Sequence, residues 1–236
     1  MRRARAILLR VAMTVGVLAA TYLLLYGQPS ELEGGLLLPY MTHVTGAYTI
    51  ALTFDDGPDP VYTPQILEVL ARYHVPATFF VLGRHVEAHP ELVGRIVAAG
   101  HAVGSHAYSH TILRWVGPGM IASELTRTDE ALWRAAGVRT GLLRHPGGMQ
   151  GPFLPFVALA GGWQVVVWSV DPRDYSAPGS AEITRRVLEE AHPGAIILLH
   201  DGSPDGDRSH RQTVEALPAI LEGLRNRGYR FVRIEP

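Results

Sequence analysis

The chain alternates between two hydrophobic patterns from about residue 47 onward. Short apolar runs predict strands at residues 47–54, 77–83, 101–106, 141–145, 163–170, 195–200 and 229–234. Between most of these runs, apolar residues recur with the period of amphipathic helices, at residues 63–74, 90–100, 120–137, 181–192 and 211–228. Strand followed by helix, repeated about seven times, is typical of an α/β fold. It predicts about seven parallel strands that close, or nearly close, into a barrel.

The first 30 residues follow a different pattern. Four arginines within the first ten residues precede an uncharged apolar run at residues 11–26. Because the Arg10 side chain can reach the lipid headgroups, residues 6–26 are long enough for one transmembrane helix. The basic flank should stay in the cytoplasm, so we expect a single-pass protein of the cell membrane whose later residues lie outside the cytoplasm. A cleaved signal peptide and a secreted domain are the alternative, although no clean small-x-small cleavage site follows the run.

Length, charge and cysteine content narrow the picture. Residues 1–30 are interpreted as basic flank and anchor, 31–46 as a linker and 47–236 as one domain. With 21 basic and 22 acidic residues the chain lacks the charge excess that steers proteins to nucleic acid, so we expect no nucleic-acid partner. No protein partner is indicated either. Because the chain has no cysteine, any metal must be held by His and carboxylate side chains.

Residues that can perform chemistry lie at the ends of predicted strands, where a parallel barrel places its active site. Two adjacent acids, Asp55 and Asp56, follow the first strand, and His106 ends the third. His110 lies four residues later, a spacing that brings both imidazoles to one side of a helical turn. Two His and one carboxylate with an open position can hold a catalytic zinc ion. One acid can then be the ligand while the other acts on water.

A second pair of histidines shows that spacing alone does not identify a metal site. His85 and His89 are also four residues apart, but they fall on a predicted outer helix, and we interpret them as surface histidines. Four further candidates lie at strand ends: Arg144 after the fourth strand, Asp171 and Asp174 after the fifth, and His200 at the end of the sixth.

Five short motifs occur in a fixed order: TFDDGPDP, HAYSH, RHPGG, DPRDY and LLHD. In this order they resemble the motifs of the polysaccharide deacetylase (NodB homology) family, carbohydrate esterase family 4. The resemblance runs from about Thr49 to Arg233. It implies an irregular (β/α) barrel that removes N- or O-acetyl groups from polysaccharides with the help of a divalent metal. Zinc is the expected metal, and cobalt and nickel are the alternatives.

The resemblance also implies a role for each of the two adjacent acids. Asp55 resembles the general base of the family, and Asp56 resembles the metal ligand that acts with His106 and His110. Neighbouring residues in an extended segment point to opposite sides. We therefore expect strand alternation to separate the two carboxylates, so that one binds the cation and the other takes a proton from water.

The remaining motifs imply the rest of the catalytic groups. His200 resembles the general acid that protonates the leaving nitrogen, and Asp174 the carboxylate that raises its pKa. Arg144 resembles the residue that orients Asp55. The backbone N–H of Gly147 resembles the donor that, together with the metal, stabilises the oxyanion. Asp171 is expected to have a structural role in its loop.

Two positions depart from the family pattern around the substrate. Gly147 stands after Pro146 where an aromatic residue is common, so the backbone donor is kept while one wall of the groove is lost. Tyr175 stands where Trp is usual, and it keeps an aromatic face while adding a hydroxyl group. Leu198 matches the apolar residue of the acetyl pocket. We expect these four residues to bind the substrate and to set its preference.

The resemblance and the predicted anchor together imply removal of N-acetyl groups from a cell-envelope polysaccharide, with release of acetate. Peptidoglycan is favoured as the N-acetylated glycan, because a tethered enzyme reaches only what lies near the membrane. Deacetylation of chitooligosaccharide or exopolysaccharide, and O-acetyl (xylan) esterase activity, are alternatives. A glycan-binding protein that keeps the fold without turnover is a rival of another class, although the intact candidate residues argue against it.

Overall fold

The computed structural model describes residues 40–149 and 151–235. The predicted anchor and most of the predicted linker therefore lie outside the described residues. Among the residues that are described, no helix has the length and the apolar character needed to cross a membrane.

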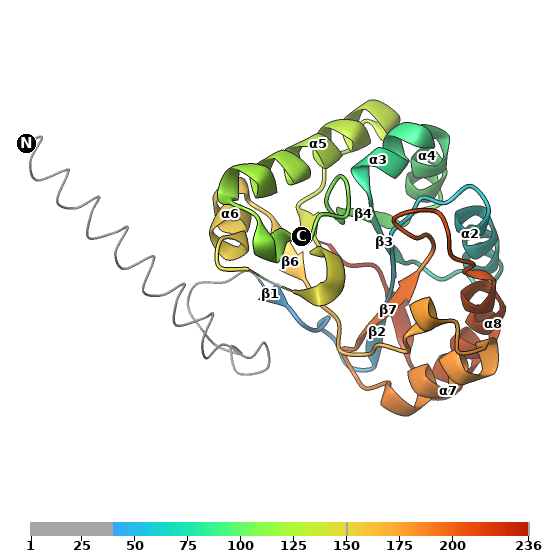
Figure 1. The fold of residues 1–236 in the computed structure, drawn as a ribbon. Helices are drawn as coiled ribbons and strands as arrows, with labels where there is room; N and C mark the ends of the chain where they lie inside the picture. The colour runs from blue at the N-terminus through green and yellow to red at the C-terminus, as the bar shows by residue number, and fades with distance from the viewer. Residues whose placement is uncertain (1–39, 150, 236) are drawn as a thin grey trace, which may run out of the picture.

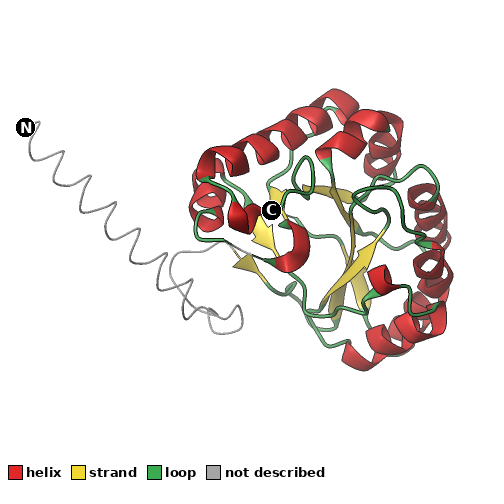
Figure 2. Ribbon diagram, in the orientation of Figure 1, coloured by secondary structure: helices red, strands yellow, loops and turns green. Residues whose placement is uncertain are grey.

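The described chain forms one parallel sheet surrounded by helices (Figures 1 and 2). The strands of this sheet are β1 (Tyr40–Met41), β2 (Thr49–Asp55), β3 (Thr78–Val81), β4 (Ala102–Ser105), β5 (Leu142–Leu143), β6 (Gln164–Val166), β7 (Ile196–His200) and β8 (Arg230–Val232). Their order is β1-β6-β5-β4-β3-β2-β7, and β8 pairs with the first half of β2. The predicted α/β fold with parallel strands is confirmed.

The helices lie around the outside of the sheet (Figure 2). They are α2 (Tyr62–Arg72), α3 (Gly83–Ala88), α4 (Pro90–Ala98), α5 (Pro118–Ala136), α6 (Leu154–Gly161), α7 (Ser180–Glu190) and α8 (Arg211–Asn226). Within residues 40–149 and 151–235, three short 3₁₀ turns lie in loops: η2 (Leu113–Trp115), η3 (Pro146–Gly148) and η4 (Asp174–Ser176). Most helices bury one apolar face against the strands, as their sequence period predicts.

The structure differs from the predicted elements in three places. Tyr40–Met41, within the predicted linker, form β1 and pair with β6. In the described residues, the barrel is not closed by a regular pair of strands. Instead, Val170 forms an isolated parallel bridge with Ile197 of β7. Helix α6 was not predicted, because its sequence LPFVALAG is apolar on every side and has no amphipathic period.

The register of the strands brings the candidate residues to one end of the sheet. Asp55, the last residue of β2, pairs with His200, the last residue of β7. Ser105 of β4 pairs with Leu143 of β5, so that His106 and Arg144 follow side by side. Strand β2 is buried along its whole length, so its carboxyl end is a rigid base for the site.

Candidate active site

Three side chains converge beyond the carboxyl ends of β2 and β4. Asp56 Oδ1 lies 3.5 Å from His106 Nε2 and 3.4 Å from His110 Nε2. One ligand atom from each residue lies within 4.8 Å of the other two. Asp56 and His106 are buried, whereas His110 is partly exposed. The structure therefore places the three predicted metal ligands around one point.

The backbone around this point adopts conformations that are uncommon for residues other than Gly. Asp56, Ala107 and His110 have φ angles of 71°, 66° and 63°. The expected strand alternation does not separate the two adjacent acids: Asp56 is left-handed and not extended, and Asp55 and Asp56 each place a carboxylate oxygen within 4 Å of His106 Nε2. Backbone strain of this kind persists only where surrounding contacts fix it, which is commonly at functional sites.

The ring of His106 is held in one tautomer. Its Nδ1 lies 2.8 Å from the carbonyl oxygen of Arg144, which can only accept a hydrogen bond, so Nδ1 carries the proton. The lone pair of Nε2 is then directed toward Asp56 and His110. Burial is the largest of the effects that lower the pKa of His106 well below its ordinary value. The imidazole is therefore neutral, which is the form that binds a metal.

The surroundings of the Asp56 carboxylate show whether these residues suit a cation. Its Oδ1 is buried and accepts no hydrogen bond within the described chain. Burial is the main cause that raises the pKa of Asp56 to about 7, so an ionised carboxylate here needs a positive partner. A divalent cation held by Asp56, His106 and His110 would supply it. Two imidazole nitrogens and one carboxylate oxygen form a ligand set that suits catalytic zinc.

Asp55 is held beside these ligands by a buried arginine. Arg144 Nη1 donates hydrogen bonds to Asp55 Oδ1 at 2.8 Å and to Thr53 Oγ1 at 2.7 Å. The guanidinium group is fully buried and lies over the ring of Phe80. Burial raises the pKa of Asp55, and Arg144 opposes that change. The other carboxylate oxygen, Oδ2, lies 3.8 Å from His106 Nε2 and is therefore beside the three metal-binding side chains.

His200 and Asp174 form a second pair across from Asp55. His200 Nδ1 lies 2.7 Å from Asp174 Oδ1, and the backbone N–H of His200 donates to Asp174 Oδ2 at 2.8 Å. Thr213 Oγ1 also donates to Oδ2, at 2.8 Å. Burial alone would lower the pKa of His200, but the charge and hydrogen bond of Asp174 outweigh it and raise this pKa to about 9. His200 thus carries a proton at neutral pH.

We expect Asp174→Asn to move the alkaline limb of the pH–rate profile to lower pH. A general acid must be protonated, so the rate should hold below the His200 pKa of about 9 and fall as pH rises through it. Without the Asp174 carboxylate, His200 loses the charge and the hydrogen bond that contribute most to raising its pKa, so that pKa should fall. The measurement is kcat for acetate release as a function of pH. Asp171→Asn is the control, because that carboxylate bonds the Arg173 backbone N–H at 2.8 Å instead. An unmoved limb in Asp174→Asn would remove Asp174 from this role.

The four predicted substrate-binding residues surround the same end of the sheet. Tyr175 meets His200 edge to face, with ring centroids 5.5 Å apart, and is exposed. Leu198 and Pro146 are buried. Gly147 has a φ of 68°, a conformation that strains a residue with a side chain. Their contacts with a substrate stay predictions.

Glu124 of α5 is a site residue that the sequence interpretation missed. Its buried carboxylate accepts the backbone N–H groups of Tyr108 and Ser109 at 2.9 and 2.8 Å, and the Ser109 hydroxyl at 3.0 Å. These bonds hold the segment that joins His106 to His110. Since that segment includes left-handed residues, we infer that Glu124 holds His110 in its ligand position.

We expect Glu124→Ala to weaken metal binding about 10- to 100-fold, as the loss of partners that orient metal ligands does. The measurement is competition for zinc with a chromophoric chelator, and excess metal should restore much of the acetate release. Glu130→Ala is the matched control, since Glu130 is an exposed residue of the same helix whose carboxylate lies 3.5 Å from Arg134 Nη2. An affinity equal to that of the control would limit Glu124 to a structural role.

The interpretation of His85 as a surface histidine was wrong. The ring is half-buried, and its Nδ1 lies 2.8 Å from the carbonyl oxygen of Asp56. Helix α3 begins two residues after β3 ends. His85 therefore lies near the carboxyl end of a strand, and this position in the sequence could have indicated that its ring lies near the site. His89, with its ring 3.9 Å from Glu91, makes no such contact with the site.

Asp201 is a second buried acid that received no role from the sequence. Its Oδ2 accepts a hydrogen bond of 2.5 Å from the Thr63 hydroxyl. A side chain at Gly57 would collide with this carboxylate, because a Cβ there would lie 2.2 Å from Oδ2. The Asp201 carboxylate thus packs against the turn that follows Asp55 and Asp56, and any side chain at Gly57 would displace it.

The chain is similar to known proteins in both sequence and fold. The family described as polysaccharide deacetylase matches residues 43–154. A chitooligosaccharide deacetylase of Sinorhizobium fredii is 42% identical over 194 residues, which cover 78% of this chain and 89% of that protein. The crystal structure of the Bc1960 peptidoglycan N-acetylglucosamine deacetylase has a TM-score of 0.78 and 35% identity, covering 84% of this chain and 91% of that one.

One structural neighbour shows that the fold occurs without activity. BA3943 of Bacillus anthracis, described as a pseudoenzyme of carbohydrate esterase family 4, has a TM-score of 0.75 and 28% identity. The match covers 83% of this chain and 67% of that one. On the combined similarity in sequence and structure, the chain belongs to the polysaccharide deacetylase family, carbohydrate esterase family 4, whose members depend on a metal.

Proposed function

We propose that the protein hydrolyses N-acetyl groups of a cell-envelope polysaccharide, with peptidoglycan as the favoured substrate, and releases acetate. One observation supports this most strongly. Asp56, His106 and His110 form a cation site that has Asp55 beside it, and His200 pairs with Asp55 in the sheet. A base and a protonated acid thus stand close to one ligand set, as amide hydrolysis requires.

Each residue of the site has its own role in the proposed reaction. A divalent metal at Asp56, His106 and His110, with zinc as our proposal, would act as a Lewis acid and lower the pKa of water toward about 7. Asp55, oriented by Arg144, takes the proton of the attacking water as the new C–O bond forms. The Gly147 N–H donates to the developing oxyanion. His200 then protonates the departing nitrogen as the C–N bond breaks, which leaves a free amine on the sugar and acetate.

The proposed location follows from the N-terminal sequence. We propose that residues 6–26 anchor the protein in the cell membrane, with the catalytic domain outside the cytoplasm; secretion after cleavage is the alternative. An anchored domain reaches glycans that lie next to the membrane. This reach favours peptidoglycan over a soluble chitooligosaccharide.

Acetate release from peptidoglycan, chitooligosaccharide and acetylxylan, each with and without a chelator, tests the proposal. We expect release from the N-acetylated glycans, most from peptidoglycan, and its loss with the chelator. Release from acetylxylan alone would assign an O-acetyl esterase. Glycan binding without acetate release in the presence of zinc would assign a pseudoenzyme, and activity that survives full metal removal would contradict the proposed site.

A further inference from the structure

Helix α6 is a surface helix with no polar side. Its sequence is LPFVALAG, and no charged residue occurs between residues 151 and 163. Leu154, Pro155 and Ala158 face the core. On the outer side, Phe153 and Phe156 are each 44% exposed and Leu159 is 57% exposed. A helix that is hydrophobic all round normally lies in a core or a membrane, so the outer side lacks its expected cover.

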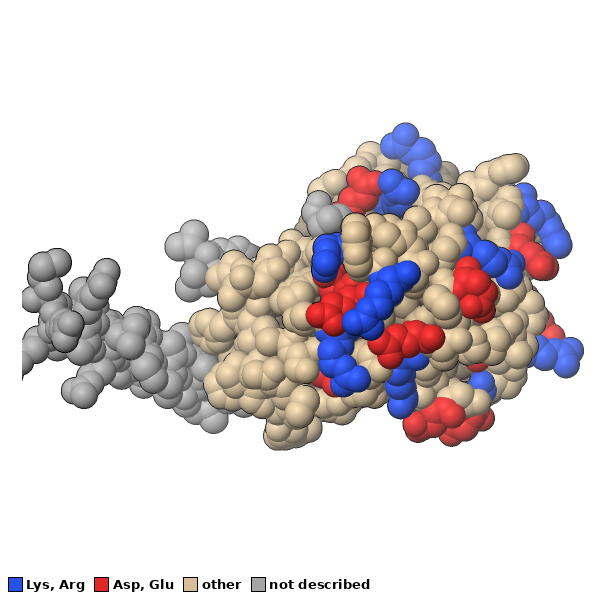
Figure 3. Space-filling model, turned by 90° about the horizontal axis from the view of Figure 1, so that it is seen from above, with Lys and Arg blue, Asp and Glu red and all other residues tan. Residues whose placement is uncertain are grey.

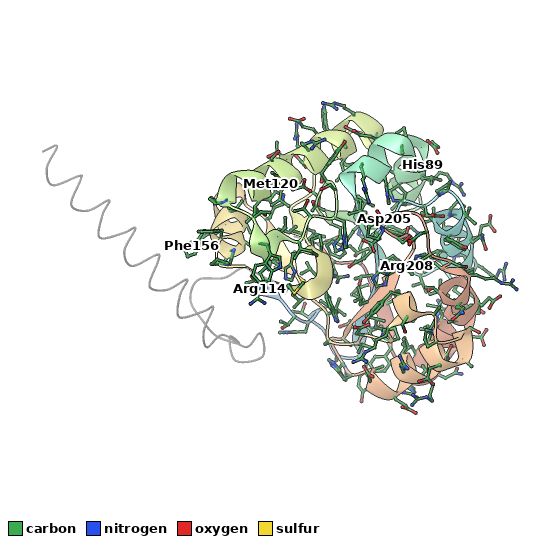
Figure 4. The ribbon with its side chains drawn as sticks, in the orientation of Figure 1. His89, Arg114, Met120, Phe156, Asp205 and Arg208 are labelled. Carbon is green, nitrogen blue, oxygen red and sulfur yellow. The ribbon has the colours of Figure 1, made fainter. Side chains whose placement is uncertain are left out.

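The apolar surface extends from α6 to the start of α5. Trp115 and Met120 are 73% and 52% exposed. Leu113 and Leu154 belong to the same buried cluster, so the two segments pack together. In Figure 4, Arg114, Met120 and Phe156 lie on the same side of the molecule. We call this surface the α6 face; it consists of Trp115, Met120, Phe153, Phe156 and Leu159. Exposed apolar side chains gathered on one side of a protein are typical of an interaction site.

The position of the N-terminal end of the described chain indicates what covers the α6 face. Tyr40 packs against the same cluster as Leu154 and Ala158, and its strand β1 pairs with β6 beside α6 (Figure 1). The residues before Tyr40 therefore reach the domain at this edge. The proposed anchor ends at residue 26, and residues 27–39 can span at most about 45 Å when fully extended. A connection of this length limits how far the α6 edge can lie from the bilayer.

The chemistry of the α6 face also suits a lipid surface. Aromatic side chains are enriched at the level of the lipid headgroups, where apolar and polar surroundings meet. The guanidinium of Arg114 lies 5.0 Å from the ring centroid of Trp115, so the exposed indole has a cation beside it for lipid phosphates. In Figure 3, which keeps the left and right of Figure 1, the left end of the domain, where Figure 1 shows α6, has only uncharged residues on its visible surface.

We propose that the α6 face rests on the outer surface of the membrane that the N-terminal segment spans, with its aromatic side chains at headgroup level. The proposal rests on the proposed anchor but not on the catalytic assignment. Contact at a second point, in addition to the anchor, would fix the orientation of the domain. The carboxyl ends of the strands, where the site lies, would then keep one fixed orientation toward the glycan.

The absence of cysteine allows a site-specific test on the full chain. Phe156→Cys and Leu159→Cys place a nitroxide spin label on the α6 face, and Glu189→Cys places one on the exposed side of α7 as the matched control. Each protein is inserted into lipid nanodiscs that contain anionic lipid. Collisions of the label with oxygen, which dissolves in lipid, are compared with collisions with chromium oxalate, which stays in water.

We expect the labels at 156 and 159 to lose collisions with chromium oxalate and to keep collisions with oxygen, while the label at 189 collides with both.

Equal exposure at all three positions in anchored protein would overturn the proposal. Protection from both reagents would show a protein cover, and dipolar broadening between labels would show a second copy. Protection that appears only after peptidoglycan fragments are added would show a glycan surface. Each of these results contradicts bilayer contact, as does failure of the chain to stay in the nanodiscs. Acetate release by the same samples is measured separately, so loss of the catalytic assignment is recognised independently.

Discussion

Asp55→Asn is expected to reduce acetate release by about 10²- to 10⁴-fold, the contribution typical of a positioned general base. The metal content should stay close to that of the unmodified protein, because Asp56, His106 and His110 are unchanged. The amide keeps the size of the carboxylate, and its oxygen can still accept the hydrogen bond of Arg144. Acetate release and bound metal are measured on the same samples.

A folding control is needed for this variant, because breaking a buried ion pair such as Asp55–Arg144 can cost about 3–5 kcal/mol. Circular dichroism and thermal unfolding show whether the protein remains folded. Asp59→Asn is the matched control; its carboxylate bonds the backbone N–H groups of Val61 and Tyr62, so both activity and metal should persist. A folded but metal-free Asp55→Asn protein would show that the two adjacent acids have the opposite roles.

His106→Ala is expected to deplete the metal and, with it, the activity. This change removes a metal ligand, so the loss of affinity should exceed the 10- to 100-fold typical of an outer partner. It also removes the bond to the Arg144 carbonyl group that fixes the tautomer. Zinc content after gel filtration, together with acetate release at saturating zinc, measures both effects.

His89→Ala is the comparison for this experiment. His89 belongs to the second pair of histidines with four-residue spacing, and its ring lies near exposed Glu91 instead of the site. This variant should keep its metal and its rate. If His106→Ala kept both as well, His106 would have no place in the site.

The sequence could predict the strands because a parallel sheet covered by helices buries both faces of each strand. Strand β2 is mostly apolar and buried at every residue for this reason, and its end is marked by Asp55. The candidate residues could be found because each one ends or follows such a strand. The distances between these candidate residues could not be predicted from the sequence. Only the register, in which Asp55 pairs with His200, shows that the base and the acid are neighbours.

Other features depended on contacts between segments that are far apart in the sequence. Glu124 binds the segment before His110, and Asp201 lies against Gly57, which no local pattern indicates. His85 was misinterpreted because its spacing suggested a surface helix, whereas its ring bonds the carbonyl group of Asp56. Helix α6 was missed because periodicity identifies a helix only when one side is polar. Its apolar outer side is also the basis of the proposed membrane contact.

Anomalous diffraction at the zinc absorption edge, on crystals grown with zinc, tests the central claim most directly. We expect one peak, bonded to Asp56, His106 and His110, with the Asp55 carboxylate held by Arg144 and not bonded to the ion. An ion bonded to Asp55 in place of Asp56, or found only away from the two histidines, would contradict the account.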